Sequence, residues 1–168
     1  LGATDAYVDV RFPYFLPRAA PVSGAVSPMR YEARFSGRKC GEHGEYTLGV
    51  QVPVTTLCPC SKAVSRYGAH NQRGEVTVAI RSSKTVWIED LIILIEKSAS
   101  SQLYSLLKRP DEKTVTERAY ENPVFVEDLV RNVVLRLKAH ENVTWYKVEA
   151  ENFESIHNHN AYACIEKG

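Results

Sequence analysis

Two segments of the sequence alternate between apolar and polar residues, and this pattern constrains the fold more than any other. In residues 46–56 every second side chain is apolar: Leu48, Val50, Val52 and Val54. Residues 75–82 repeat the pattern with Val76, Val78 and Ile80. Because successive side chains of a strand point to opposite faces, both segments are predicted to be half-buried strands. Pro53 cannot donate to a neighbouring strand, so we expect its N–H side at an edge or a bulge.

Apolar residues at helical spacing follow. In residues 87–108 they are Ile88, Leu91, Ile92, Ile95, Ala99, Leu103 and Leu106, which predicts one long amphipathic helix. The polar stretch 109–121 is predicted to separate it from a second helix, capped by Asn122 and with Pro123 at its first position. The buried stripe expected for that second helix is Val126, Leu129, Val130, Val133 and Leu137.

Short strand-like segments close the chain at residues 143–150 and 161–166. From Tyr46 onward the predicted order is therefore ββααββ, which gives an α+β fold: an antiparallel sheet with both helices on one face. Two further strand-like pieces, residues 6–11 and 29–35, are expected to be joined by a loop rich in Pro, Gly and Ser.

The predicted organisation is in two parts. Residues 1–45 would be the last strands of a preceding, incomplete module, and residues 46–168 a complete module. A sheet of this kind keeps open edges, and proteins commonly protect such edges by pairing them with another module or subunit. We therefore expect a homo-oligomer.

Charge and cysteine content narrow the classes of partner. The 21 Lys and Arg residues nearly balance the 20 Asp and Glu residues of this 168-residue chain, so neither a nucleic-acid nor a membrane partner is expected. No apolar run reaches the roughly 18 residues of a membrane-spanning helix. The four cysteines are too few and too unevenly spaced for a secreted disulfide framework, which favours the cytoplasm.

The triplet Cys58-Pro59-Cys60 follows directly after a predicted strand. Its spacing fits neither a thioredoxin-type motif nor a zinc ribbon. A catalytic metal site needs only about three protein ligands, and Cys58 and His70 can supply two. The other candidates for ligands are two histidines and three carboxylates, namely His157, His159, Asp111, Glu112 and Glu117.

Two longer motifs carry a family resemblance. Residues 52–62 (VPVTTLCPCSK) and 67–74 (YGAHNQRG) closely resemble the prokaryotic type IB GTP cyclohydrolase family, and residues 20–24 and 157–161 also look like it. The resemblance implies a tunnelling fold, in which ββααββ modules join into barrels with active sites between subunits. It also implies conversion of GTP and water to 7,8-dihydroneopterin triphosphate and formate, the first step of tetrahydrofolate biosynthesis and a source of deazapurine-modified nucleosides.

The same resemblance implies a divalent metal ion, either zinc or manganese or else iron. Carried over residue by residue, its ligands fall on Cys58, His70, Glu112 and His157. Such an ion lowers the pKa of its bound water from about 15.7 toward about 7, which yields a nucleophile for the purine ring. The resemblance thus implies that Cys58 and His157 are catalytic as well as metal-binding.

The remaining assignments concern protons and substrate. Glu154 is predicted to carry protons beside or through His157. Glu127 is expected to anchor the purine ring by accepting two parallel N–H bonds. Lys62 and Arg66, together with Arg73, are candidates for offsetting the charge of the triphosphate.

Two alternatives to a cyclohydrolase stay open. A nitrile reductase of queuosine synthesis, on the same fold, would use a covalent cysteine thioimide and a nicotinamide cofactor. A non-catalytic binding module would use the ion only to hold its loops. Cys60 is either a thiol adjoining the metal ligands or a redox partner of Cys58.

Overall fold

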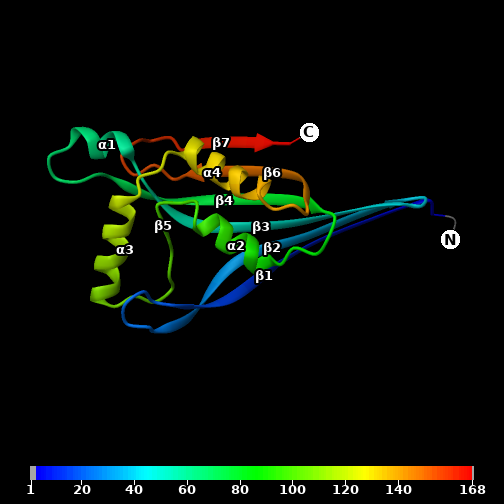
Figure 1. Cartoon of the computed structure of the whole chain (residues 1–168), viewed down its shortest axis with the longest axis horizontal. Helices are drawn as coiled ribbons and strands as arrows, with labels where there is room; N and C mark the ends of the chain where they lie inside the picture. Colours follow the sequence, from blue (N-terminus) through cyan, green and yellow to red (C-terminus); the bar gives the residue numbers. More distant parts are fainter. Residues whose placement is uncertain (1–2, 168) are drawn as a thin grey trace.

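The computed structural model describes residues 3–167, which form an α+β fold around one antiparallel sheet (Figure 1). The strands are β1 (Asp5–Ala19), β2 (Val26–Cys40), β3 (His43–Leu57), β4 (Asn71–Ser82), β5 (Ser101–Gln102), β6 (Val143–Asn152) and β7 (Ala161–Glu166). Their spatial order is β1-β2-β3-β4-β6-β7, and β5 pairs with β3. The helices are α1 (Pro59–Val64), α2 (Ile88–Glu96), α3 (Arg109–Glu121) and α4 (Val126–Lys138). The predicted fold class and antiparallel sheet are confirmed.

One face of the sheet forms the core beneath α2 and α4. The alternating residues of β3 and β4 are buried there as expected, with Val52, Val54, Val76 and Val78 fully enclosed. All five residues of the predicted α4 stripe are buried too. Each such side chain removed from water contributes about 1.5–3 kcal/mol, so this face holds the sheet and the two helices together.

The prediction of one long helix over residues 87–108 is wrong, because α2 ends at Glu96. The serines that follow bond both back to α2 and across to β3. Ser98 Oγ donates to the Leu94 carbonyl over 2.8 Å, and Ser100 Oγ accepts from the Leu57 N–H over 3.1 Å. The Ser100 bond and the pairing of Ser101 with Thr55 hold the chain against β3, so it leaves the helix and forms β5.

The predicted separator at residues 109–121 is also wrong, since it is helix α3. Asn122 ends this helix and does not begin the next, and the residue before α4 is Phe125, two residues after Pro123. Pro110 at the start of α3 and the acidic residues of its first turn are ordinary helix-start signals. The helix lacks a strong apolar stripe because it runs along the end of the sheet and buries little of its surface (Figure 1).

The loop expected between residues 11 and 29 is a third difference. β1 and β2 are each 15 residues long, so only residues 20–25 form the turn of their hairpin. Pro17 and Pro28 lie opposite each other in this hairpin. Prolines are tolerated here because β1 is an edge strand and the pairing of β2 with β3 begins only at Glu32.

Pro53 of β3 lies at a fork in the sheet. On one side it pairs with Glu75 of β4. On the other side the pairing with β2 ends at Gln51 and the pairing with β5 begins at Val54. The missing N–H of Pro53 therefore falls where neither strand needs it, in line with the expected edge position.

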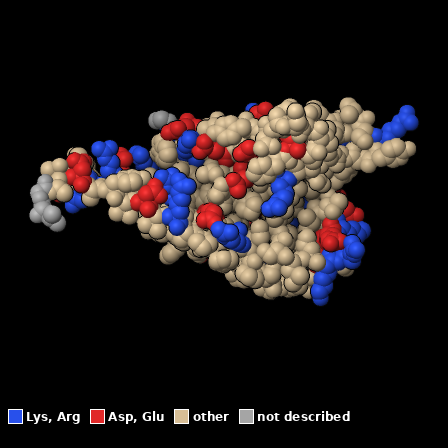
Figure 2. All heavy atoms as spheres, turned by 180° about the vertical axis from the view of Figure 1, so that it is seen from behind, with Lys and Arg blue, Asp and Glu red and all other residues tan. Residues whose placement is uncertain are grey.

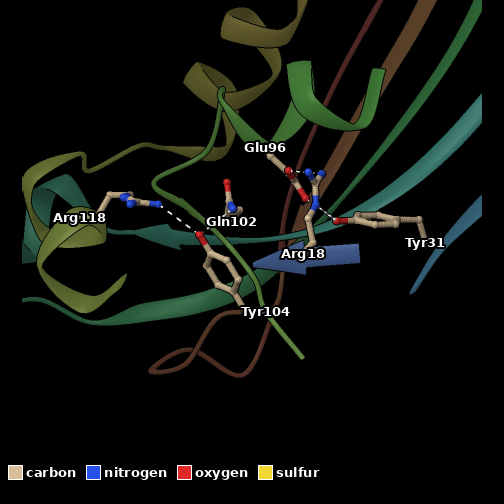
Figure 3. A network of polar contacts seen from close by, with 6 residues as sticks. All are labelled: Arg18, Tyr31, Glu96, Gln102, Tyr104 and Arg118. Carbon is tan, nitrogen blue, oxygen red and sulfur yellow. Dashed lines mark hydrogen bonds and ion pairs between the residues drawn. The ribbon is translucent and has the colours of Figure 1, made fainter. Parts of the chain in front are cut away.

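A buried ion pair fastens α2 to the first hairpin (Figure 3). Arg18 of β1 donates to the Glu96 carboxylate over 2.6 Å, and the Tyr31 hydroxyl of β2 donates to the same carboxylate over 2.6 Å. Only 4% of the Glu96 side chain is exposed. Burial raises the pKa of the Glu96 carboxyl above its ordinary value of 4.5, although Tyr31 and Arg18 favour the charged form.

Replacing Arg18 with methionine is expected to destabilise the protein by about 3 kcal/mol at neutral pH, because a buried carboxylate loses its cation. The folded state holds the Glu96 proton more tightly than the unfolded chain does. The stabilisation that Glu96 contributes is therefore complete below the pKa of its carboxyl in the unfolded chain. It is lost as pH rises through the pKa of that carboxyl in the folded state. Without Arg18 this loss deepens, so urea unfolding should show a larger cost at about pH 8 than at about pH 5. A Glu96→Gln variant has no charge to bury. If its free energy of unfolding depended on pH as strongly as that of Arg18→Met, this explanation would be wrong.

Asp111 joins α3 to the hairpin turn. Its fully buried carboxylate accepts from the Val22 N–H, the Ser23 N–H and the Ser23 hydroxyl at 2.8, 2.8 and 2.7 Å, and from the Lys108 N–H at 2.9 Å. Burial alone would raise the pKa of this carboxyl, but the bonds from Ser23, Lys108 and Val22 outweigh burial and hold the pKa well below its ordinary value. All the acceptor capacity of Asp111 is therefore used inside the fold.

An Asp111→Asn variant should melt several degrees lower at neutral pH, because the amide accepts fewer of these bonds. The depressed pKa means that the Asp111 contribution is present above the unfolded pKa and is lost as pH falls below about 5. The difference in Tm between wild type and variant should therefore shrink in acid. Asp90→Asn, a change at an exposed acid of α2, is the control. A constant difference down to about pH 3 would contradict the structural role of Asp111.

Charges of both signs are interspersed on the side of the molecule opposite to that of Figure 1, without an extended patch of one sign (Figure 2). In residues 3–167 no helix combines the length and apolar character needed to cross a bilayer. The four cysteines are all unpaired.

Candidate functional site

A cavity of about 170 Å³ lies where β3 and β6 end and β4 begins, near the start of α4. Its polar wall consists of Cys58, Gln72, Glu127, Asn152 and Glu154, and its apolar wall of Val124, Phe125, Val126 and Ala161. A larger hollow of about 420 Å³ lies over β1 to β4, but its lining contains neither cysteine nor histidine. The smaller cavity therefore holds the chemistry that the sequence indicated.

Cys58 is held in place by the backbone on both sides. Its N–H donates to the His70 carbonyl over 3.1 Å, which extends the pairing of β3 with β4 by one step. Its side chain caps α1, where Sγ accepts from the Ser61 N–H over 3.4 Å, and Pro59 occupies the first turn. The Ser61 hydroxyl also accepts from the His70 N–H over 3.2 Å. Cys58 and His70 thus form a fixed pair at the end of the sheet.

His70 is anchored by one ring nitrogen. Its Nδ1 lies 3.0 Å from Gln72 Oε1 and 3.3 Å from the Ser155 hydroxyl. The Ser155 contact brings the loop of residues 153–160 to the side of His70. His157 lies two residues further along this loop, exposed, with its ring stacked on His159 at a centroid distance of 5.2 Å.

Glu154 and Glu127 approach the cavity from different elements. Glu154 directly follows Phe153, whose N–H donates to the Arg73 carbonyl over 2.9 Å and so fixes the start of the loop. Glu127 stands in the first turn of α4, where no side chain caps the helix. The structure therefore brings together four of the predicted residues, Cys58, His70, Glu127 and Glu154, with His157 on the adjoining loop.

The side chains predicted to bind the triphosphate do not line the cavity. Lys62 Nζ donates to the Tyr120 carbonyl over 2.5 Å and lies 4.4 Å from the centre of the Tyr120 ring, so it joins α1 to α3. Arg66 is exposed on the loop between α1 and β4. Arg73 lines a different hollow, together with Arg30 and Glu75. Only Lys62 and Arg66 lie on the segment that carries Cys58.

Glu112 is not brought to Cys58 within this chain. It lies in the first turn of α3 and pairs with Arg109 over 3.1 Å, whereas Lys62 meets the last turn of α3 at Tyr120. Eight residues of helix separate Glu112 from Tyr120, a rise of about 12 Å. Glu117 pairs with Lys113 over 2.8 Å. Within residues 3–167 no three His, Cys, Asp or Glu side chains are grouped closely enough to hold an ion.

Sequence reasoning missed Gln72 and Asn152, which are 7% and 2% exposed beneath the cavity. Gln72 Nε2 donates to Thr56 Oγ1 over 2.8 Å. Among the described residues Asn152 Oδ1 has no hydrogen-bond partner. A signal was available: Thr56 and Gln72 continue the buried positions of β3 and β4, yet both are polar. A polar residue at a buried strand position marks a site that needs a hydrogen bond.

The donor types around the cavity fit a zinc-like ion. A thiolate and an imidazole are ligands that zinc accepts, and a histidine ligand ordinarily has its other ring nitrogen in a hydrogen bond, as His70 Nδ1 has. A further imidazole, that of His157, lies two residues beyond Ser155, whose hydroxyl is 3.3 Å from His70 Nδ1. A site with three ligands requires the exposed loop of residues 153–160 to place His157 next to Cys58 and His70.

The family model described as type I GTP cyclohydrolase folE2 matches residues 1–163. The chain belongs to this FolE2 family. The "GTP cyclohydrolase FolE2" proteins of Geobacter metallireducens and Geobacter sulfurreducens are 59% and 61% identical to it over 167 residues, and that of Akkermansia muciniphila is 59% identical over 170 residues. Each alignment covers 99% of this chain and 64% of the FolE2 relative, so the chain spans about two thirds of their length.

Among solved structures, the uricase of Arthrobacter globiformis matches 98% of this FolE2 chain and 63% of its own, with a TM-score of 0.49 and 10% identity. The cavity of this FolE2 chain is therefore described from its own contacts, which place Cys58, Glu127 and Glu154 around it and His70 beside Cys58.

Proposed function

We propose that the chain carries the active site of a type IB GTP cyclohydrolase, which converts GTP and water to 7,8-dihydroneopterin triphosphate and formate. The observation that supports this most is the meeting of Cys58, Glu127 and Glu154 around one cavity, with His70 hydrogen-bonded to the backbone of Cys58. These residues come from four separate segments of the sequence. The reaction itself is inferred from membership of the FolE2 family.

Cys58, His70 and His157 would hold a zinc, manganese or iron ion. When bound, the ion would supply a Lewis acid that activates water at neutral pH. Cys58 is suited to this position because the backbone on either side of it is fixed by His70 and Ser61. Glu112 would join only from another copy of the chain, since within one chain it lies on the far part of α3.

The other cavity residues have roles that follow from their positions. Glu127 would accept two N–H bonds from the edge of a guanine base, close to the positive end of the α4 dipole, which favours a carboxylate. Val124, Phe125 and Val126 provide the apolar wall against which a planar ring can pack. Glu154 also lines this cavity and stands at the start of the loop that carries His157, where it would move protons to and from the ring.

The triphosphate would extend along α1. Lys62 and Arg66 are the cations on this segment, and Lys62 would have to leave the Tyr120 carbonyl to meet a phosphate. An ammonium group on a flexible stem can make this exchange, because its bond to a neutral carbonyl is weaker than one to a phosphate.

Oligomerisation would complete the site. β1 and β7 are the two edges of the sheet, and both carry exposed apolar side chains, Tyr7, Val8, Tyr162 and Ile165. Pairing of such edges between subunits removes their unsatisfied backbone groups. In the family's tunnelling fold this pairing would close barrels and place active sites between subunits.

The test is formate release from GTP by the purified protein. We expect release that a chelator abolishes and that added manganese or zinc restores. Consumption of NADPH with a nitrile substrate, without dependence on metal, would overturn the proposal in favour of a nitrile reductase. Binding of GTP without formate release at any metal concentration would identify a binding module instead.

A further inference from the structure

Two buried polar residues, Thr56 and Gln72, form a hydrogen-bonded chain that ends at His70. Thr56 Oγ1 accepts from Gln72 Nε2 over 2.8 Å, and Gln72 Oε1 lies 3.0 Å from His70 Nδ1. Thr56 is 0% exposed and Gln72 only 7%. A glutamine buried on the apolar side of a sheet costs stability unless its amide is bonded at both ends, as it is here.

The orientation of the Gln72 amide decides which nitrogen of His70 carries hydrogen. Neutral imidazole has one N–H and one lone pair. An amide oxygen can only accept, so with Oε1 facing Nδ1 the hydrogen lies on Nδ1 and the lone pair on Nε2. Rotating the amide by half a turn would point its NH₂ at Nδ1 and move the hydrogen to Nε2. Only the first arrangement leaves Nε2 able to bind a metal ion.

We propose that Gln72, hydrogen-bonded to Thr56 and with Oε1 facing Nδ1, is the positioning residue that sets the tautomer of His70 and so prepares it as a metal ligand. This inference rests on the proposed function. Ser155 is a weaker substitute for Gln72, because its hydroxyl is 3.3 Å from Nδ1 and lies on an exposed loop where water competes. Gln72 instead acts from strand β4, and only 7% of it is exposed.

Zinc affinity measured by competition with a chromophoric chelator tests the proposal. Gln72→Met keeps the length of the side chain but offers no acceptor, and it should weaken zinc binding by about 10- to 100-fold. Gln72→Glu keeps an acceptor toward Nδ1 and should bind zinc at least tenfold more tightly than Gln72→Met. Gln102→Met removes an amide bonded to Tyr104, away from the cavity, and should bind as wild type does.

A second measurement needs no variant. Nitrogen NMR of ¹⁵N-histidine in the wild-type protein, freed of metal by chelation at about pH 8, distinguishes protonated from unprotonated ring nitrogens. We expect the hydrogen of His70 on Nδ1. A His70 hydrogen on Nε2 would overturn the proposal, as would zinc affinity of Gln72→Met within about threefold of wild type. If wild type bound none of zinc, manganese and iron, the proposed function would fall together with this inference, whereas the other two results would remove this inference alone.

Discussion

Replacing Cys58 with alanine is expected to reduce formate release from GTP by more than 100-fold while the fold stays in place. Changes to groups that merely support a metal ligand cost about 10–100-fold, so loss of a direct ligand should cost more. The structural cost is small, because the bond from the Cys58 N–H to the His70 carbonyl does not involve the side chain. Loss of the α1 cap costs about 1 kcal/mol, which lowers Tm by about 2–4 °C.

Cys60→Ala is the matched control for this experiment. Cys60 is exposed, lies two residues from Cys58 and does not line the cavity, so its loss should leave formate release near the wild-type rate. Cys58→Ser adds a second comparison, since it keeps the helix cap but replaces the thiolate with a poor ligand. If Cys58→Ala released formate as fast as wild type, the role assigned to Cys58 would be wrong. A large fall in Tm with nucleotide binding preserved would favour a metal-stabilised binding module.

Glu154→Gln is expected to lower kcat by about 10²- to 10⁴-fold, the usual contribution of a positioned proton carrier. The amide has nearly the shape of the carboxylate but cannot take up a proton. Because Glu154 belongs to the cavity wall and holds no part of the sheet together, KM for GTP and Tm should change little. The quantity to measure is therefore the separate effect on kcat and KM in steady-state formate release.

Glu151→Gln controls for the loss of a negative charge nearby. Glu151 is three residues earlier, accepts from Asn160 over 2.7 Å and lines a different hollow with Glu75 and Glu149. It should retain activity. Equal losses in Glu151→Gln and Glu154→Gln would point to general electrostatics and would contradict a proton-transfer role for Glu154.

The strands and the α4 stripe could be predicted because their periodicity reflects burial on one face. Val50, Val52 and Val54 alternate with partly exposed residues, and tertiary packing follows this local pattern. Helix α3 could not be found from periodicity, since it packs beside the sheet and only Asp111 and Ala119 are buried. Its start was readable only from Pro110 and the acidic residues of the first turn. The end of α2 depended on the bond between the Ser100 hydroxyl and the Leu57 N–H of β3, a distant partner that local apolar spacing does not encode.

The residues of the candidate site could likewise be predicted only in part. Cys58 and His70 were recognisable because they end two strands that pair with each other, so their proximity follows from the topology. Glu112 was carried over by resemblance alone, and its distance from Cys58 along α3 depends on a helix that the sequence pattern concealed. Gln72 and Asn152 went unnoticed because a polar residue at a buried position reads as a break in the pattern until its partners are known.

The most direct measurement is the anomalous scattering of crystals grown with zinc or manganese, recorded on either side of the absorption edge of the metal. The expected result is one peak per site at about 2.3 Å from Cys58 Sγ and about 2.0–2.1 Å from His70 Nε2 for zinc, with His157 completing the set. Active, metal-loaded protein whose anomalous peak lay away from both Cys58 and His70 would contradict the assignment of this cavity as the metal-dependent cyclohydrolase site.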